Sequence, residues 1–485
     1  MAQMNTSESR RLSRTFILTC LVIIIAGAAL SFVDLGGPSL WLDEAFTWFF
    51  VQLDWRSAIT AIQIDAVNPP FYYLFVKALT TGSVLSEAAL RAPSALAQLF
   101  GIAAVIFLGY RLGGEPGGAA AGLLWATHPL IVWASRDARP YALAAALGAG
   151  AVCAFLTLRR SLSTPASVAA IVFLALGLIT HYFFFVLTAA LILFALIDIR
   201  RSPSFFRRWT LLTLAAMIPL AIWLTFYFSQ ASPSLGIGWI RTPRLSDIPL
   251  TLWNLISGYA GVFDVASLAF GLIVIVALGI VIFYGDRSQG TRIVLTGLLI
   301  PVVAVWVVSQ RRPVYMDRYF IVLMPLVAGI FALGTSAAAK QLSRTWARWA
   351  AVIVCALIAL SAGFSVHSAW KFEKEDWREL VAFLELESAA DESYSVWGLD
   401  ITLPLGFYDF ADLDSGLPSL IPACESPCWW ILRQPYTATH ALTQSVKESG
   451  RSGAPVFPDE CSQKTAWHSL TGVSAWKLQC LAKGE

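Results

Sequence analysis

Apolar runs long enough to cross a lipid bilayer recur along most of this 485-residue chain, and they constrain its fold more than any other feature. A hydrocarbon core about 30 Å thick takes roughly 17–25 apolar residues as one helix. Only 13% of the residues are charged, about half the usual share of a soluble domain. The sequence therefore predicts an all-α polytopic membrane bundle of about 11 transmembrane helices, within a range of 11 to 13. Spans are expected at 15–33, 91–110, 117–134, 140–158, 165–179, 182–199, 209–229, 266–284, 291–308, 318–337 and 346–366.

The basic residues indicate how these spans are oriented. They gather in alternate connections, and the positive-inside rule assigns those connections to the cytoplasm. The N-terminus is then cytoplasmic, and the outer face receives 34–90, 135–139, 180–181, 230–265, 309–317 and all residues after 367. The basic residues on the inner side are Arg10, Arg11, Arg14, Arg111, Arg159, Arg160, Arg200, Arg201, Arg207, Arg208, Arg287, Arg292, Lys340, Arg344 and Arg348.

Two apolar stretches do not have the length of a single membrane-spanning helix: one is too long and the other is too short. The run 165–199 would be roughly 50 Å long as one helix, so it is expected to turn at Thr180-His181-Tyr182. Residues 69–84 would reach only about 22 Å and contain Lys77. This stretch is expected to be an interfacial or re-entrant helix on the outer face.

Composition changes near Val366, where charged residues return and apolar runs shorten. The prediction is a transmembrane domain over 1–366, with its first external loop at 34–90, and a small α/β external domain over 367–485. A helix is expected at 374–387 and strands at 393–399, 429–435 and 473–480. In an oxidising compartment the four cysteines of this region would form two disulfides in one of three pairings: Cys424, Cys428, Cys461 and Cys480.

Charged residues cluster at the outer ends of the predicted spans, where they are costly and often functional. Asp43-Glu44 follows the first span and could supply a general base, a metal ligand or a solvated loop. Arg136-Asp137-Ala138-Arg139 places two arginines outside, where they could bind a phosphate or pair with Asp137 to hold the loop. Together these groups favour a site for an anionic lipid-linked substrate.

Two further outer positions belong to the same face. His181 lies at the turn between two spans, where a single histidine is more often structural than catalytic. Arg318 lies at the start of a late span, at the depth of a lipid phosphate, although an interfacial arginine can also simply extend to the headgroup region.

An ordered set of short motifs resembles the type C glycosyltransferases, in particular the bacterial relatives of protein O-mannosyltransferases and of aminoarabinose lipid A transferases. The set runs over most of the membrane region and fades in 230–265 and through most of the tail. It comprises Asp43-Glu44, Asn68-Pro69-Pro70-Phe71-Tyr72-Tyr73, Arg91-Ala92-Pro93-Ser94-Ala95, Ala138-Arg139-Pro140-Tyr141-Ala142, Thr180-His181-Tyr182, Arg318-Tyr319-Phe320 and Asp376-Trp377-Arg378.

The resemblance implies roles for individual residues. Asp43 would be the general base that deprotonates an acceptor hydroxyl, with inversion at the anomeric carbon, and Glu44 would orient the site. Arg139 and Arg318 would stabilise the leaving phosphate. Further donor-binding residues would be Arg136, Tyr141, Lys77, Asn68 and Tyr319, and substrate-binding residues would be His181, Tyr182, Asp137 and Tyr72. Several relatives carry a cation where this chain has the neutral Asn68.

The implied reaction moves a sugar from a polyprenyl-phosphate donor to a glycan, lipid or protein acceptor at the outer side of a bacterial cytoplasmic membrane. No metal site and no cofactor is expected, although the resemblance leaves room for a divalent metal ion. The small net charge of +3 argues against a nucleic-acid partner. Three alternatives remain: a transporter or flippase of the lipid-linked sugar, a ligase or polymerase of such glycans, and an inactive relative that only binds.

Overall fold

The computed structural model describes most of the membrane region and parts of the tail. The described residues are 12–229, 240–258, 293–341, 375–387, 393–397, 402–408, 428–433, 461–468 and 473–480, with isolated positions between 268 and 279. The predicted span at 346–366 lies outside them, and the predicted span at 266–284 does so for the most part.

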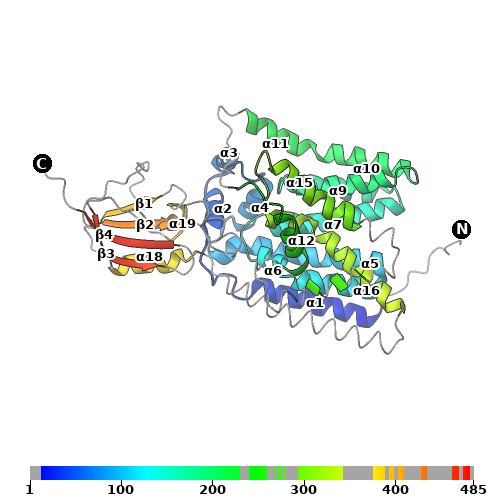
Figure 1. Cartoon of the computed structure of the whole chain (residues 1–485), viewed down its shortest axis with the longest axis horizontal. Coiled ribbons are helices and arrows are strands. Elements are labelled where there is room, and N and C mark those ends of the chain that lie inside the picture. Colours follow the sequence, from blue (N-terminus) through cyan, green and yellow to red (C-terminus); the bar gives the residue numbers. More distant parts are fainter. Residues whose placement is uncertain are drawn as a thin grey trace.

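A helical bundle forms the larger part of the molecule (Figure 1). Five of its described helices are long and apolar enough to cross a membrane. The chain is therefore a polytopic membrane protein, while the exact number of crossings remains a prediction. The described bundle helices are α1 (Arg14–Phe32), α5 (Glu87–Thr127), α6 (Pro129–Ser135), α7 (Tyr141–Arg160), α8 (Thr164–Leu178), α9 (Phe184–Ile197), α10 (Pro203–Ala216), α11 (Ile218–Phe228), α12 (Asp247–Ser257), α15 (Ile300–Ser309) and α16 (Met324–Gln341), with short helical segments at Ile293–Leu299 (η1) and Asp317–Leu323 (η2).

Helix α5 is a hairpin, which explains its length of 41 residues. Gly114 has a φ of +69°, a conformation that glycine adopts at little cost, and the chain reverses there. The two halves then pack closely, because a Cβ atom on Gly109 would come within 2.4 Å of the carbonyl oxygen of Gly117. The two halves correspond to the separate spans predicted at 91–110 and 117–134.

The break predicted at Thr180-His181-Tyr182 is present, since α8 ends at Leu178 and α9 begins at Phe184. The stretch predicted as interfacial contains only the ten-residue helix α4 (Phe71–Thr80). A helix of that length spans about 15 Å, too little to cross a bilayer. Together with α2 (Leu42–Gln52) and α3 (Trp55–Asp65), it lies at the end of the bundle nearest the C-terminal sheet (Figure 1).

Within its described residues, the tail contributes two short helices and a four-stranded sheet with the order β1-β2-β4-β3. Strands β1 and β2 are parallel, and the other neighbours are antiparallel. The helix and three of the strands lie at the ranges expected from the sequence, whereas the strand at 461–468 was not expected. That this region is a separate external domain remains a prediction. The elements are α18 (Trp377–Glu387), α19 (Thr402–Phe407), β1 (Ser393–Trp397), β2 (Cys428–Arg433), β3 (Cys461–His468) and β4 (Val473–Cys480).

The strand register makes a specific prediction about the cysteines. Cys461 in β3 is the backbone partner of Cys480 in β4. Facing residues of antiparallel strands have Cα atoms about 4.5–5.5 Å apart, which is within the range of a disulfide. We therefore expect a Cys461–Cys480 bond, whereas Cys424 lies outside the described residues. Peptide mass mapping without reduction would test this, and a Cys428–Cys480 peptide would contradict it.

Candidate active site

Asp43 lies in the first turn of α2, at the end of the bundle that faces the sheet. Its side chain is 25% exposed, and its Oδ2 atom lies 3.5 Å from Nη2 of Arg318. Arg139 approaches the same residue and donates a hydrogen bond from Nη1 to the backbone oxygen of Asp43 at 3.0 Å. A partly accessible carboxylate and two guanidinium groups therefore meet at one point, although they come from segments far apart in the sequence.

Hydrogen bonds to the neighbouring Asp317 and contacts with three aromatic rings position Arg318. Asp317 accepts hydrogen bonds from the backbone N–H of Arg318 and from Nδ2 of Asn254, at 2.8 and 2.7 Å. The guanidinium group lies within about 6 Å of three aromatic ring centres, which is the geometry of a cation–π contact. These rings belong to Trp41 at 5.6 Å, Tyr141 at 5.9 Å and Tyr319 at 5.8 Å.

Arg139 follows α6 in the loop 136–140 and is only 5% exposed. Its Nη1 atom also donates to the hydroxyl of Tyr73 at 3.3 Å, and Asn68 donates to that same hydroxyl. Within the described part of the chain its Nε has no hydrogen-bond partner. A buried arginine with a donor to spare is suited to binding an anion.

His181 lies behind these arginines, packed against the rings of Tyr141, Phe183 and Tyr319. Burial first, and then the positive charges of Arg139 and Arg318, lower the pKa of this imidazole to about 3. A depressed pKa keeps the ring neutral at every pH above that value. Because Nδ1 accepts the N–H of Phe183 at 3.1 Å, the proton belongs on Nε2, which becomes a potential donor to a substrate oxygen.

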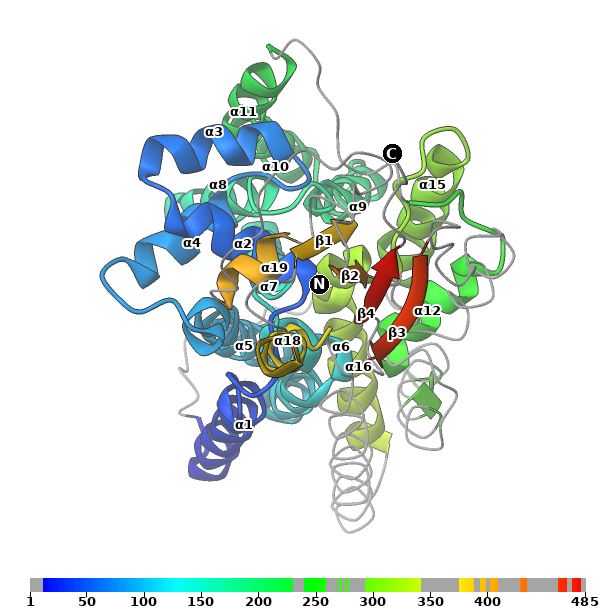
Figure 2. The ribbon, with the colours of Figure 1, turned by 90° about the vertical axis from the view of Figure 1, so that its left-hand side faces the viewer.

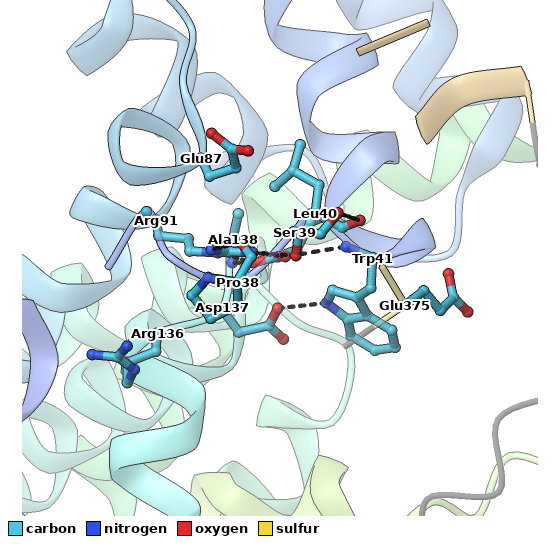
Figure 3. A network of polar contacts seen from close by, with 12 residues as sticks. Pro38, Ser39, Leu40, Trp41, Glu87, Arg91, Arg136, Asp137, Ala138 and Glu375 are labelled. Carbon is cyan, nitrogen blue, oxygen red and sulfur yellow. Dashed lines mark hydrogen bonds and ion pairs between the residues drawn. The ribbon is translucent and has the colours of Figure 1, made fainter. Parts of the chain in front are cut away.

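Glu44 takes a different position from its neighbour Asp43. It is fully buried and binds Arg91 through two hydrogen bonds, Nε to Oε1 at 2.7 Å and Nη2 to Oε2 at 2.6 Å. Its Oε1 also accepts the backbone N–H of Ala138 at 2.8 Å. Figure 3 shows Arg91 reaching the segment that precedes Asp43. Glu44 thus joins α2, α5 and the loop of Arg139.

Two of the predicted donor-binding residues lie away from Asp43, Arg139 and Arg318. Their side chains instead bind backbone oxygens at the C-terminal ends of helices. Arg136 donates to the backbone oxygens of Val33 and Asp34, at the C-terminal end of α1. Lys77 donates to the backbone oxygens of Val51 and Leu53, at the C-terminal end of α2. Both cations are placed where a helix end is negative, which is favourable without any ligand.

Three of the predicted substrate-binding residues make contacts within the protein. Asp137 is buried and accepts a hydrogen bond from Nε1 of Trp41 at 2.8 Å. The hydroxyl of Tyr72 pairs with that of Ser94, and Nε1 of Trp223 donates to the hydroxyl of Tyr182. Of these, the Asp137 contact bears directly on the site, because it fixes a ring that faces Arg318.

Several residues of the site were not among the predicted ones. Arg91 and Tyr73 were noted only as parts of motifs, and Asn254 lies where the resemblance fades. Arg91 could have been identified from the sequence as a charged residue in the first turns of an otherwise apolar helix. In the described part of the chain, no group of three acidic, histidine or cysteine side chains is placed to hold a metal ion.

The chain was compared with known families and structures. Residues 67–226 match the sequence profile of the family described as dolichyl-phosphate-mannose-protein mannosyltransferase. No curated protein sequence matches. Among solved structures, ArnT from Cupriavidus metallidurans bound to undecaprenyl phosphate has a TM-score of 0.59 at 13% identity, covering 96% of this chain and 98% of ArnT.

Two other solved structures are similar over smaller shares. The Archaeoglobus fulgidus oligosaccharyltransferase in complex with zinc and sulfate has a TM-score of 0.49 at 12% identity, covering 79% of this chain and 60% of that one. The arabinosyltransferase EmbB from Mycobacterium smegmatis has 0.40 at 14%, covering 76% and 39%. The resemblance inferred from the motifs is thus confirmed: the chain has the type C glycosyltransferase fold and, over residues 67–226, the sequence signature of the dolichyl-phosphate-mannose-protein mannosyltransferase family.

Proposed function

We propose that this protein is a membrane glycosyltransferase that moves a sugar from a polyprenyl-phosphate donor to an acceptor hydroxyl. The observation that carries the proposal is the meeting of one accessible carboxylate with two arginines, Asp43 with Arg318 and Arg139. Support for the donor comes from the matched family, which is named for dolichyl-phosphate-mannose, and from the ArnT structure, which contains undecaprenyl phosphate.

In the proposed reaction Asp43 takes the proton of the acceptor hydroxyl as that oxygen attacks the anomeric carbon of the sugar. The bond from this carbon to the phosphate oxygen breaks on the opposite side, so the configuration inverts. Arg318 and Arg139 stabilise the negative charge that the departing lipid phosphate gains. The donor phosphate would draw Arg318 away from Asp43, which would leave the carboxylate free to act as a base.

The proposed reaction takes place outside the cytoplasm, in a bacterial cytoplasmic membrane. The described basic residues of these connections support this orientation, because they lie at the end of the bundle opposite Asp43. For example, Arg159 and Arg160 end α7, whereas Tyr141 begins it next to the site. In this orientation the region 367–485 is periplasmic, and the donor reaches Asp43 from the outer leaflet.

Lipid analysis of cells tests the proposal most directly. Cells that lack the protein are expected to accumulate one polyprenyl-phosphate sugar and to lose one substituent from a surface glycan, lipid or protein. A plasmid copy of the wild-type gene should reverse both changes. Accumulation of the lipid-linked sugar on the cytoplasmic leaflet alone would instead indicate a flippase and would contradict the transferase.

Arg318→Ala is expected to impair use of the donor. A charge-assisted hydrogen bond contributes about 1.5–3 kcal/mol, so the KM for the donor should rise roughly 10- to 150-fold. Transfer assays with purified protein and a series of donor concentrations would measure this. Arg312→Ala is the matched control, because Arg312 is an exposed arginine on the same connection. An unchanged donor KM in Arg318→Ala would remove the phosphate role.

A further inference from the structure

The segment 36–42 connects the first transmembrane helix to Asp43 and forms no regular structure of its own before α2 begins at Leu42. Polar groups in such a segment need partners, because a buried backbone group without a hydrogen bond is costly. Many of those partners come from the tail of the chain, more than 330 residues further along.

Glu375 and Tyr408 bind the backbone nearest to Asp43. The buried carboxylate of Glu375 accepts the N–H of Leu42 at 3.1 Å, and it also accepts Nε1 of Trp377 at 2.9 Å. Leu42 is the first residue of α2, so Glu375 supplies an acceptor for an N–H group that the helix itself leaves unpaired. The hydroxyl of Tyr408 accepts the N–H of Leu40 at 2.8 Å.

Arg378 binds the start of the same segment. Its guanidinium group donates to the backbone oxygens of Gly36 and Gly37 at 3.2 and 3.0 Å and forms an ion pair with Glu87. Glu87 in turn accepts the hydroxyl of Tyr408 at 3.0 Å. The tail therefore contacts both ends of the segment and also the start of α5.

Arg91 holds the segment from the opposite side. It donates to the backbone oxygens of Leu35, Pro38 and Ser39 at 2.8–2.9 Å. In Figure 3 Arg91 and Glu375 lie on opposite sides of residues 38–41. The segment is thus fixed between a side chain of the membrane bundle and side chains of the tail.

Apolar packing joins the tail to α2 as well. Phe407 of α19 packs edge-to-face on Trp48 of α2, with ring centres 5.7 Å apart. Leu405 of α19 and Trp377 of α18 are fully buried. Seen from the sheet side, α19 lies in front of α2 (Figure 2). This part of the tail is therefore packed against the element that carries Asp43.

We propose that Glu375 and Tyr408 are positioning residues, which hold the segment 36–42 so that Asp43 faces Arg318. The tail then completes the active site. This inference depends on the proposed function only for the reaction that Asp43 performs. The contacts themselves can be tested without any reaction.

Hydrogen exchange of the full chain tests the contacts. In Glu375→Leu the amide of Leu42 is expected to exchange at least tenfold faster, and in Tyr408→Phe the same holds for Leu40. Glu385→Gln is the control, because Glu385 lies on the exposed side of α18. Unchanged exchange at Leu40 and Leu42 would overturn the inference.

Transfer assays on the same variants test the consequence. We expect kcat to fall at least tenfold in Glu375→Leu, with the donor KM changed less than twofold, and Glu375→Gln to regain most of the loss because it keeps an acceptor oxygen. Faster exchange with an unchanged kcat would show that the tail holds the segment without positioning Asp43, which contradicts the proposal. If wild-type protein transfers no sugar from any polyprenyl-phosphate donor, the proposed function fails, while the exchange rates still decide on the contacts.

Discussion

Asp43→Asn is expected to reduce sugar transfer by at least about a hundredfold and to leave donor binding within a few-fold of wild type. General base catalysis contributes roughly 10²–10⁴-fold, and the amide of asparagine cannot take up the proton. The size and shape of the side chain are nearly unchanged, and the carboxylate is 25% exposed, so the fold should tolerate the change. Single-turnover assays with purified protein, next to equilibrium binding of the lipid donor, would separate the two effects.

Asp54→Asn is a suitable control for this result. Asp54 lies in the same outer region and caps α3, where its carboxylate accepts the N–H groups of Arg56 and Ser57. Asparagine can cap a helix nearly as well as aspartate, so the control should keep full activity. Turnover in Asp43→Asn within tenfold of wild type would remove Asp43 as the base.

Glu44→Gln is expected to have the largest effect on stability. The Glu44–Arg91 pair is almost completely buried, with side-chain exposures of 0% and 1%. Loss of one partner from a buried ion pair leaves an uncompensated charge and typically costs about 3–5 kcal/mol. Denaturation of the purified protein in mixed micelles would measure the loss of unfolding free energy.

The matched control for this result is Asp198→Asn. Asp198 pairs with Arg159 at the other end of the bundle, where the arginine is 39% exposed. Asp198 itself is only 9% exposed, but solvent screens the arginine, so this pair should contribute less than the fully buried one. A loss in Glu44→Gln no larger than in Asp198→Asn would show that the buried pair is not needed to hold the loop.

The fold could be predicted from the sequence where one physical rule dominated. The apolar runs located the long bundle helices that the structure describes, and the polar turn at Thr180 located the break between α8 and α9. Hydropathy could not predict how the two halves of α5 pair, because the pairing depends on close contact between Gly109 and Gly117. The strand at 461–468 was missed because its sequence Cys-Ser-Gln-Lys-Thr-Ala-Trp-His does not alternate in polarity as a half-buried strand should.

For the site as well, the sequence located some residues, whereas the orientation of others depends on packing. The motifs located Asp43, Arg139 and Arg318, and the structure brings these three together. The residue pattern alone could not separate the adjacent carboxylates, and only the resemblance gave them different roles. That Asp43 faces Arg318 while Glu44 is buried against Arg91 depends on how the first turn of α2 is placed. Nor could the sequence show that Arg136 faces the end of α1 rather than the cluster, since that depends on how the helices pack.

The contact between Glu375 and Leu42 also orders events during biosynthesis. A ribosome adds about 5–20 residues per second, so the 333 residues between the two positions take roughly 20–70 seconds to make. During that interval the segment before Asp43 has Arg91 as a partner but not Glu375, Arg378 or Tyr408. The newly made membrane helices would therefore be inserted, and could meet the lipid pool, before the site is complete. We therefore expect a chain truncated before residue 375 to be inserted into the membrane but to be inactive.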